Sequence, residues 1–465
     1  MVPGIMQGIS SPDCLWRIWV FLDAVFLGVS TRLKKDCFPT SLEKVWWTPL
    51  ATRSDPALAL LRRNHDFGKL ALGLFFSTLG DAALSVAVVW RITMLDVHFL
   101  PLLGLVVMIP RILTMIGGWV ADHVPLRRSM MSLDLFRGIV LMGAALGVSH
   151  CNMDATVFIG IASLGMVALA DAVYDPARMA LMAQIVEADD LLAGNGIITT
   201  VNHSGRIAGQ LLGGLIMASL RFSAVLWTDA ATFVISALLL GWIHNRAESP
   251  VTISKNVLNR RFLAEFSIFW RVRWLMTFAP ASVLINIVFS ASFLLLSAFI
   301  KHRFHATALR YSLFLIMWSV GQILGAMTVP RFQNFPVKTT AAGAACVQGL
   351  CFMVFVLSPN MGVSLAAFMG AGYANSASNA LKNTLFMRAT PLNLRGRLFG
   401  FLGGFVQLGT PLAPLLAALI LDHERLGMIW IATAVVSFLL AAIYLTLQVD
   451  PSHKGDEAYD CQKIP

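Results

Sequence analysis

The segment Gly117–Arg128, GGWVADHVPLRR, lies between two long apolar runs, Phe99–Val120 and Leu133–Val148. A membrane span needs ~20 mainly apolar residues to cross ~30 Å of hydrocarbon. A short loop with an acid and two arginines between two such runs is typical of the cytoplasmic side of a polytopic carrier. The segment therefore predicts a chain that crosses the bilayer repeatedly.

The rest of the chain repeats this pattern. Of its 465 residues, 57% are hydrophobic and only 13% are charged, whereas a soluble domain is about one quarter charged. Backbone groups in lipid must be satisfied within each segment, so the spans are helices. We expect an all-α membrane protein with about twelve transmembrane helices of this length, near 68–93, 99–120, 130–149, 155–181, 195–219, 222–244, 275–300, 309–330, 339–358, 361–387, 396–421 and 426–448.

The charges indicate the topology. The net charge of +10 could suggest nucleic acid, but the basic residues concentrate in alternate loops, which is the positive-inside pattern. This pattern predicts that both termini are cytoplasmic. Lys301, Arg303 and Arg310 lie in a loop on the other side and go against the rule.

A weak internal repeat divides the chain into halves. At an offset of 204 residues, five pairs coincide: Gly117 with Gly321, Arg127 with Arg331, Arg178 with Lys382, Gly196 with Gly400, and Gly205 with Gly409. Two related halves with a path at their interface are common in secondary transporters. We expect an N-terminal cytoplasmic extension, interfacial or disordered (1–66), a six-helix bundle (67–244), a central cytoplasmic loop (245–274), a second six-helix bundle (275–448) and a cytoplasmic tail (449–465).

The loop Gly117–Arg128 has the composition of a conformational latch, that is, of contacts that form in one conformation and break in the other. Gly118 allows close helix approach, and Asp122 is an anion suited to a helix N-terminus. Arg127 and Arg128 can pair with carboxylates or lipid headgroups. Two further latch candidates, Asp175 and Arg178, lie at the cytoplasmic end of the fourth predicted helix. Simple topology explains the arginines but not Asp122 or the glycine.

A ladder of glycines occupies the fifth predicted helix. Its members are Gly196, Gly205, Gly209, Gly213 and Gly214. The spacing of four residues aligns three of them along one helix face, which lets a neighbouring backbone approach closely. Ordinary tight packing is the alternative to a functional role.

Charged residues within spans are costly and functional by default. Asp81, well inside the first helix, is the first candidate for a proton-coupling carboxylate, and a structural hydrogen bond is the alternative. Asp229 in the sixth helix is a second candidate. Arg206 in the fifth helix could pair with either carboxylate.

These motifs resemble the major facilitator superfamily. Gly118, Asp122, Arg127 and Arg128 match its loop G-x-x-x-D-R-x-G-R-R, in which His123 and Pro125 depart from the pattern. The glycine ladder is similar to the superfamily's antiporter signature, G-x8-G-x3-G-P-x2-G-G, with Gln210 in place of proline. In the family that signature marks exporters.

Further segments resemble the twelve-helix drug and siderophore efflux branch, which includes macrolide and enterobactin exporters. They are STLGD (Ser77–Asp81), LDLFR (Leu133–Arg137), YDPARMA (Tyr174–Ala180), DAATF (Asp229–Phe233) and PLNLRGRLF (Pro391–Phe399). The resemblance covers residues 67–448. It implies two pseudo-symmetric six-helix bundles, and secondary active export of a small lipophilic or siderophore-like solute from the inner membrane by proton antiport with alternating access.

Two alternatives remain. One is a lysophospholipid flippase of the same superfamily. The other is a polytopic membrane enzyme such as an acyltransferase, for which His150 and Asp154 come closest to the required His and acid at fixed spacing. No Walker, HExxH or GxSxG motif occurs, and the six cysteines form no CxxC. We therefore expect no catalytic residues, metal or cofactor. The expected partners are a small-molecule substrate, protons and the lipid bilayer, without nucleic acid, and the expected state is a monomer.

Overall fold

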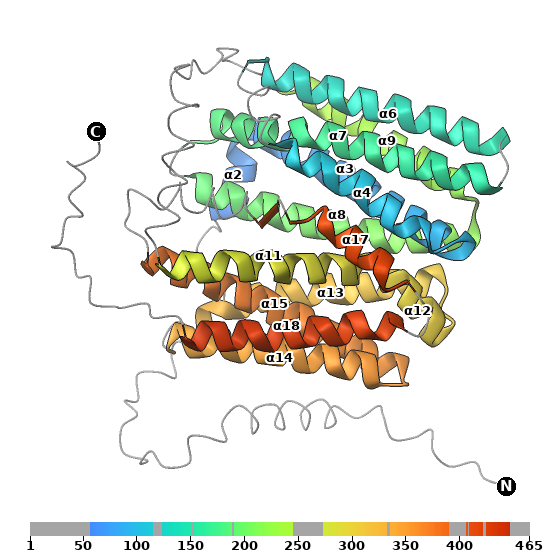
Figure 1. Ribbon diagram of the computed structural model, residues 1–465. Coiled ribbons are helices and arrows are strands. Elements are labelled where there is room, and N and C mark those ends of the chain that lie inside the picture. The colour runs from blue at the N-terminus through green and yellow to red at the C-terminus, as the bar shows by residue number, and fades with distance from the viewer. Residues whose placement is uncertain are drawn as a thin grey trace, which may run out of the picture. The chain divides into compact units, whose positions relative to one another are not determined.

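The computed structural model describes residues 56–114, 123–150, 153–187, 190–244, 273–332, 335–389, 406–407, 409–421 and 425–446. All regular elements within these ranges are helices (Figure 1). In the first half they are α2 (Pro56–Arg63), α3 (His65–Leu95), α4 (Phe99–Ile112), α6 (Leu126–His150), α7 (Met153–Ile185), α8 (Leu191–Ser219) and α9 (Phe222–Gly241). In the second half they are α11 (Arg273–Leu294), α12 (Leu296–Phe304), α13 (Ala308–Thr328), η2 (Val329–Phe332), α14 (Val337–Leu357), α15 (Met361–Ala389), α17 (Leu412–Leu419) and α18 (Leu426–Thr446).

The predicted all-α membrane class is confirmed. Each predicted span overlaps at least one helix. Among the described residues, seven helices are long and apolar enough to cross a membrane, and an eighth span results if Pro280–Leu294 and Leu296–Phe304, bent by 48°, count as one. Helices α8 and α15 fall outside this set. Both carry several amide and charged side chains, which lower their hydropathy.

Side chains fix the start of two helices. The side chain of Asn64 accepts a hydrogen bond from the backbone N–H of Phe67, 2.9 Å away, at the first turn of α3. Thr307 accepts from the backbone N–H of Arg310 at the start of α13. Such caps satisfy backbone donors that a helix leaves free at its N-terminus. They set the boundaries of helices whose length comes from the apolar sequence.

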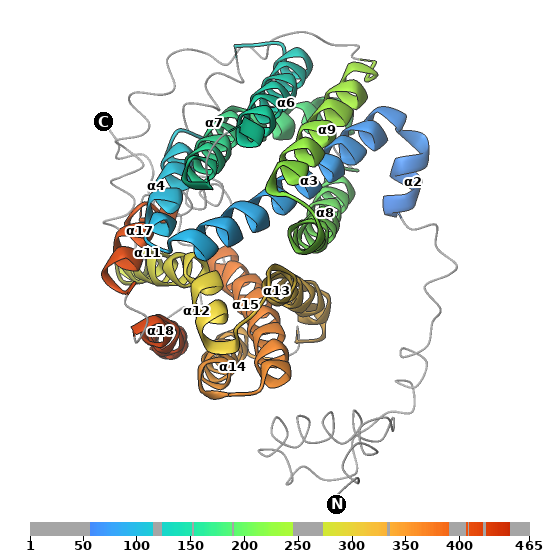
Figure 2. The same ribbon diagram turned by 90° about the vertical axis from the view of Figure 1, so that its right-hand side faces the viewer.

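The helix contacts form two groups. In the N-terminal helix group (α3–α9), α3 packs against α8 and α9, and α6 packs against α7 and α9. In the C-terminal helix group (α11–α18), α15 packs against α13 and α14, and α18 packs against α11 and α14. The groups meet mainly where α8 contacts α13 and where α4 contacts α17 (Figure 2). We call these two contacts the seam.

Helix α2 falls within the predicted N-terminal extension. It contacts α3 and α8. Leu60 is buried in a cluster that includes Phe67 and Val186. Residues 1–55 and the tail 449–465 lie outside the described residues. Helix α2 therefore packs onto the N-terminal helix group.

Candidate functional site

The glycines of α8 bring its backbone against α3. A Cβ atom on Gly205 would lie 2.8 Å from the carbonyl oxygen of Phe75. One on Gly213 would lie 2.6 Å from the carbonyl oxygen of Ala83. Gly209, between them, faces the carbonyl oxygen of Leu79 at still closer range. The carbonyls are spaced by four residues, as the glycines are, so two helix faces of equal period interlock.

The other two glycines of the ladder behave differently. Gly214 faces Ser312 and Leu309 of α13, across the seam. A Cβ atom on Gly196 would meet nothing within 4 Å in the described part of the chain. At the second seam contact, a Cβ on Gly104 of α4 would lie 2.7 Å from Pro414 of α17. Both contacts of the seam therefore include a glycine, which leaves room for side chains of the opposite group.

A buried ion cluster lies inside the N-terminal helix group. Arg137 of α6 is 1% exposed, and its guanidinium lies 3.4 Å from a carboxylate oxygen of Asp134 and 2.8 Å from one of Asp171 on α7. Ser236 of α9 donates a 2.7 Å hydrogen bond to Asp134. The guanidinium carbon also lies 4.5 Å from the ring centre of Tyr174. Three helices thus converge on one buried cation.

The two predicted coupling carboxylates border this cluster. Asp81 lies within electrostatic range of Asp171, Asp229, Asp134 and Arg137. Asp229 is fully buried, and its Oδ1 accepts a 3.2 Å hydrogen bond from Thr232. Within the described part of the chain, Oδ1 of Asp81 and Oδ2 of Asp229 are buried without a hydrogen-bond partner. These oxygens are suited to carry a proton, because an ionised carboxylate in the spans is costly.

A glycine makes room for this arrangement. A Cβ atom on Gly80 of α3 would overlap the carboxylate of Asp229 and the hydroxyl of Thr232. Gly80 precedes Asp81 directly. Gly80 therefore lets α3 pack closely against α9 at Asp229.

The arginine that the structure places within electrostatic range of these carboxylates is Arg137, which was not a candidate from the sequence. Arg137 acts electrostatically on both Asp81 and Asp229. The side chain of Arg206 is exposed, and its neighbour in charge is His203. Arg206 follows Gly205, which faces α3, so its own side chain points about 100° away around the helix.

Sequence reasoning missed Arg137 and Asp134. Both lie in LDLFR, which was identified only as a family motif. Their i, i+3 spacing on an apolar helix was the available signal, since it places opposite charges on one face. An intramembrane Arg–Asp pair at this spacing predicts a buried ion pair.

The latch candidates are partly described. Gly118 and Asp122 lie outside the described residues. Arg127 donates hydrogen bonds to the carbonyl oxygens of Ile243 and Gly241 at the end of α9, where the helix dipole favours a cation. Asp175 and Arg178 form an ion pair at 3.2 Å within α7. Arg128 is exposed.

The basic residues that oppose the positive-inside rule have a local role. Lys301 of α12 donates a 2.6 Å hydrogen bond to the carbonyl oxygen of Thr93 near the end of α3. Arg303 contacts the carbonyl oxygen of Leu357, the last residue of α14, at 3.5 Å. Cations at helix C-termini are favoured by the helix dipole. The hydroxyls of Thr93 and Ser297 are 2.7 Å apart and add a second link between α3 and α12.

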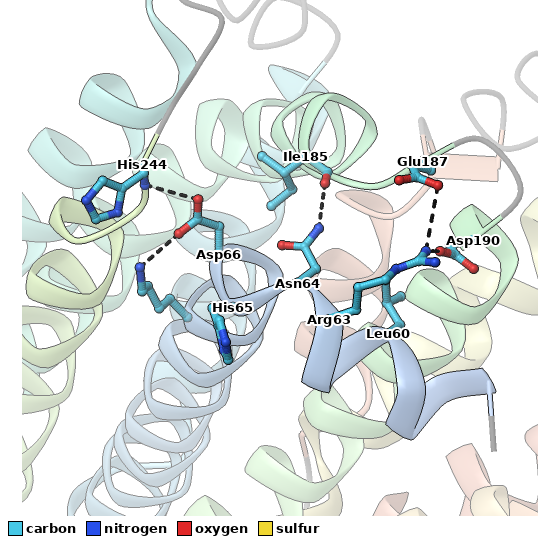
Figure 3. A pocket seen from close by; sticks show the side chains of 10 residues that line it. Leu60, Arg63, Asn64, His65, Asp66, Ile185, Glu187, Asp190 and His244 are labelled. Carbon is cyan, nitrogen blue, oxygen red and sulfur yellow. Dashed lines mark hydrogen bonds and ion pairs between the residues drawn. The ribbon is translucent and has the colours of Figure 1, made fainter. Parts of the chain in front are cut away.

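A surface pocket of about 530 Å³ lies where α2 and α3 meet the ends of α7 and α9 (Figure 3). Arg63 pairs with Asp190 and Glu187, and the side chain of Asn64 donates a 2.6 Å hydrogen bond to the carbonyl oxygen of Ile185. The charged side chains that line this pocket therefore form ion pairs with one another. The described residues contain no group of three or more His, Cys, Asp or Glu side chains able to hold a metal.

Comparison with known proteins shows a family match and several similar proteins. The model of the Major Facilitator Superfamily matches residues 70–403. The multidrug efflux pump Tap of Mycolicibacterium fortuitum is 23% identical over 404 residues, which cover 83% of this chain and 97% of Tap. The uncharacterized MFS-type transporter YjbB of Bacillus subtilis is 25% identical over 209 residues, 45% of this chain and 51% of YjbB.

Solved structures agree on the fold. A bacterial homologue of the iron transporter ferroportin, in an inward-facing state, superposes with a TM-score of 0.67 at 16% identity, covering 82% of this chain and 98% of that one. The nucleoside transporter NupG gives a TM-score of 0.63 at 14% identity, covering 81% and 98%. At these identities the likeness concerns the fold alone.

Proposed function

Because the chain belongs to the Major Facilitator Superfamily, and is thus a multi-pass membrane transporter, we propose that it exports a small lipophilic or siderophore-like solute in exchange for protons. The proposed setting is the inner membrane, with both termini cytoplasmic and a monomer as the working unit. The buried cluster of Asp81, Asp229 and Arg137 is the observation that carries the proposal of proton coupling.

Two features support export rather than import. The glycine ladder of α8 has the spacing of the superfamily's exporter signature, and three of its members interlock with α3. The relative matched over nearly its whole length, Tap, is named a multidrug efflux pump. We therefore assign this chain the same direction of transport.

Charge balance supports proton coupling. Asp134 and Asp171 pair with the guanidinium of Arg137, and Asp81 and Asp229 lie within its electrostatic range, so the fully ionised cluster carries an excess of negative charge. Binding a proton at Asp81 reduces this excess, and releasing it restores the attraction to Arg137. Because Arg137 connects α6 and α7, each protonation changes the forces between helices of the N-terminal helix group.

The proposed cycle tilts two six-helix bundles, 67–244 and 275–448, about the seam. Contacts near one end of the bundles, Lys301 to Thr93 and Thr93 to Ser297, join the halves on the side proposed to be external. The loop with Asp122, Arg127 and Arg128, together with Asp175 and Arg178, is the proposed latch on the cytoplasmic side. Access alternates as one set of contacts breaks and the other forms.

Replacing Asp81 with asparagine tests the coupling. Asparagine has the same shape but cannot take up a proton, so proton-driven export in everted vesicles should fall to background while the amount of folded protein is unchanged. Proton release from the vesicles, followed with acridine orange after substrate addition, is the measurement. Asp96→Asn is the matched control, because Asp96 is exposed beyond the end of α3 and bonds to His98. Wild-type export by Asp81→Asn would remove Asp81 from the mechanism.

A substrate panel tests the function itself. A deletion strain should become sensitive to lipophilic drugs or should lose secretion of a siderophore, and the intact gene should restore the phenotype. A strain unchanged in both respects, but altered in lysophospholipid uptake, would favour the flippase alternative.

A further inference from the structure

The two halves carry one motif with different charges. Helix α7 contains Asp171, Asp175 and Arg178, in the pattern D-x3-D-x2-R. At the repeat offset of 204 residues, α15 contains N-x3-N-x2-K, formed by Asn375, Asn379 and Lys382. The cation is kept in the second half, whereas both carboxylates are replaced by amides.

In the first half, the motif is neutralised internally. Arg178 pairs with Asp175 at 3.2 Å, and Asp171 pairs with Arg137 at 2.8 Å. Each cation of this region has a carboxylate of the same helix group as its partner. This is the ordinary solution for charged groups inside a bundle, because an unpaired charge there is costly.

In the second half, the cation lacks such a partner. The ammonium of Lys382 donates a 2.7 Å hydrogen bond to Oδ1 of Asn379, whose amide nitrogen donates a 3.1 Å hydrogen bond to Asn375. Amides are neutral, so within the described residues the contacts of this ammonium do not balance its positive charge. The sequence contains no Asp or Glu between Glu265 and Asp422, so no carboxylate is available anywhere in the segment that forms α11 to α17.

The position of Lys382 differs from that of the other cations described in this half. Lys301 and Arg303 lie in the last turn of α12, Arg310 lies in the first turn of α13, and Lys338 lies at the start of α14. Lys382 lies two turns inside the end of α15. It is enclosed by protein atoms and yet retains exposed surface. Topology alone accounts for cations at helix ends but not for this one.

The side-chain stripe that holds Lys382 contacts α11 at its two ends, and Phe368 at one end also packs against rings of α13, α14 and α18. Phe368, Asn375, Asn379, Lys382 and Phe386 recur every three to seven residues along one face of α15. Both ends of the stripe meet α11, since the ring centres of Phe368 and Phe293 are 5.8 Å apart and those of Phe386 and Phe278 are 4.5 Å apart.

Between these aromatic contacts the stripe on α15 is polar. Asn379 is exposed, although Phe368 and Phe386 at the ends of its stripe are buried. On α11, Asn286 lies between Phe278 and Phe293 in the sequence and accepts a 3.3 Å hydrogen bond from Thr410. A polar interval with a lysine, amides and flanking aromatic rings is the composition of a site for an aromatic or amphiphilic anion.

We propose that Lys382, with Asn379 and Asn375, binds the anionic group of the transported solute, a carboxylate or phenolate on an apolar body. The inference rests on the proposed function in taking this anion to be the exported solute. The ammonium supplies the charge and the amides hold the ammonium in place. The absence of Asp and Glu between Glu265 and Asp422 leaves this charge available to an anion from outside. The same composition disfavours cationic solutes at this place.

Equilibrium binding of two dyes to the purified full-length protein in nanodiscs tests the site. Fluorescein and rhodamine 123 share the xanthene ring system, but the first is an anion and the second a cation. Lys382→Gln should weaken fluorescein binding about tenfold or more, because a charged hydrogen bond in the interior is lost. Rhodamine 123 binding should not weaken, and Lys382→Arg should retain fluorescein binding.

Two further variants sharpen the test. Asn379→Asp gives Lys382 the internal partner that Arg178 has, and should abolish fluorescein binding while the fold is kept. Lys338→Gln removes the same charge from the same half outside the stripe, and should change neither dye. Absence of saturable fluorescein binding to the wild type, equal losses for both dyes, or unchanged binding in Lys382→Gln and Asn379→Asp would overturn the proposal.

The experiment separates this site from the proposed function. Binding in nanodiscs needs no proton gradient and no export. A protein that binds fluorescein through Lys382 but fails to export any solute supports the anion site and contradicts the proposed function. If export persists and Lys382→Gln leaves fluorescein binding unchanged, the proposed function is supported and the anion site is contradicted.

Discussion

Replacing Arg137 with glutamine should destabilise the protein more than any other single change in the N-terminal helix group. The guanidinium is 1% exposed and pairs with Asp134, which is fully buried, and with Asp171. Removing one partner of a buried ion pair leaves an uncompensated charge, which costs about 3–5 kcal/mol. Thermal unfolding in detergent, followed by fluorescence-detected size exclusion, is the measurement. We expect a large drop in melting temperature and little folded protein at growth temperature.

A matched control and a double variant identify the cause. Arg221→Gln removes the same charge from an exposed position before α9 and should unfold like the wild type. Arg137→Gln combined with Asp134→Asn removes both members of the pair and should recover part of the lost stability, because the fully buried carboxylate that paired with Arg137 is then neutral. A wild-type melting temperature for Arg137→Gln, or an additive loss in the double variant, would contradict this explanation.

Replacing Gly209 with valine should abolish transport. A Cβ atom at this position would overlap the carbonyl oxygen of Leu79 and lie 2.8 Å from Cβ of Ala82. These are backbone and first side-chain atoms of α3, so neither can turn aside. Overpacking of this kind costs about 1–3 kcal/mol, and separation of α3 from α8 also displaces Asp81. We expect export in everted vesicles at background level even from the folded fraction.

Gly196 provides the control on the same helix. Within the described ranges it has nothing within 4 Å of a Cβ position, so Gly196→Ala and Gly196→Val should fold and transport. Gly209→Ala should lie between wild type and Gly209→Val, because the overlap begins at Cβ. Equal transport by Gly196→Val and Gly209→Val would show that the ladder is not a close-packed face.

The sequence was sufficient for features that depend on periodicity. The glycine spacing of α8 predicted a close helix contact, and Gly205, Gly209 and Gly213 make it. Apolar length predicted the helical class. Which neighbour receives the glycine face could not be read from one chain, since it depends on the packing of α3 against α8.

The partners of the buried charges were harder to predict. Arg206 was a candidate partner of either Asp81 or Asp229, but the rotation of α8 that turns Gly205 toward α3 leaves the side chain of Arg206 exposed. The pairing of Arg137 with Asp134 follows from their i, i+3 spacing, whereas its extension to Asp171 depends on how α6 packs against α7. Lys301 is an exception to the positive-inside rule, which considers only the charges of loops. Its contact with the carbonyl oxygen of Thr93 depends on how α12 packs against α3 and could not be predicted from the sequence.

The most direct test of alternating access is a reversible link across the halves. Thr93 of α3 and Ser297 of α12 have hydroxyl oxygens 2.7 Å apart, so the sulfur atoms of cysteines at these positions would lie near each other and can be tested for a disulfide. In a background without the native cysteines, Thr93→Cys with Ser297→Cys should fold, lose export when oxidised and regain it after reduction. Each single cysteine variant should export under both conditions. Undiminished export by the fully cross-linked protein would contradict a cycle in which these two helices separate.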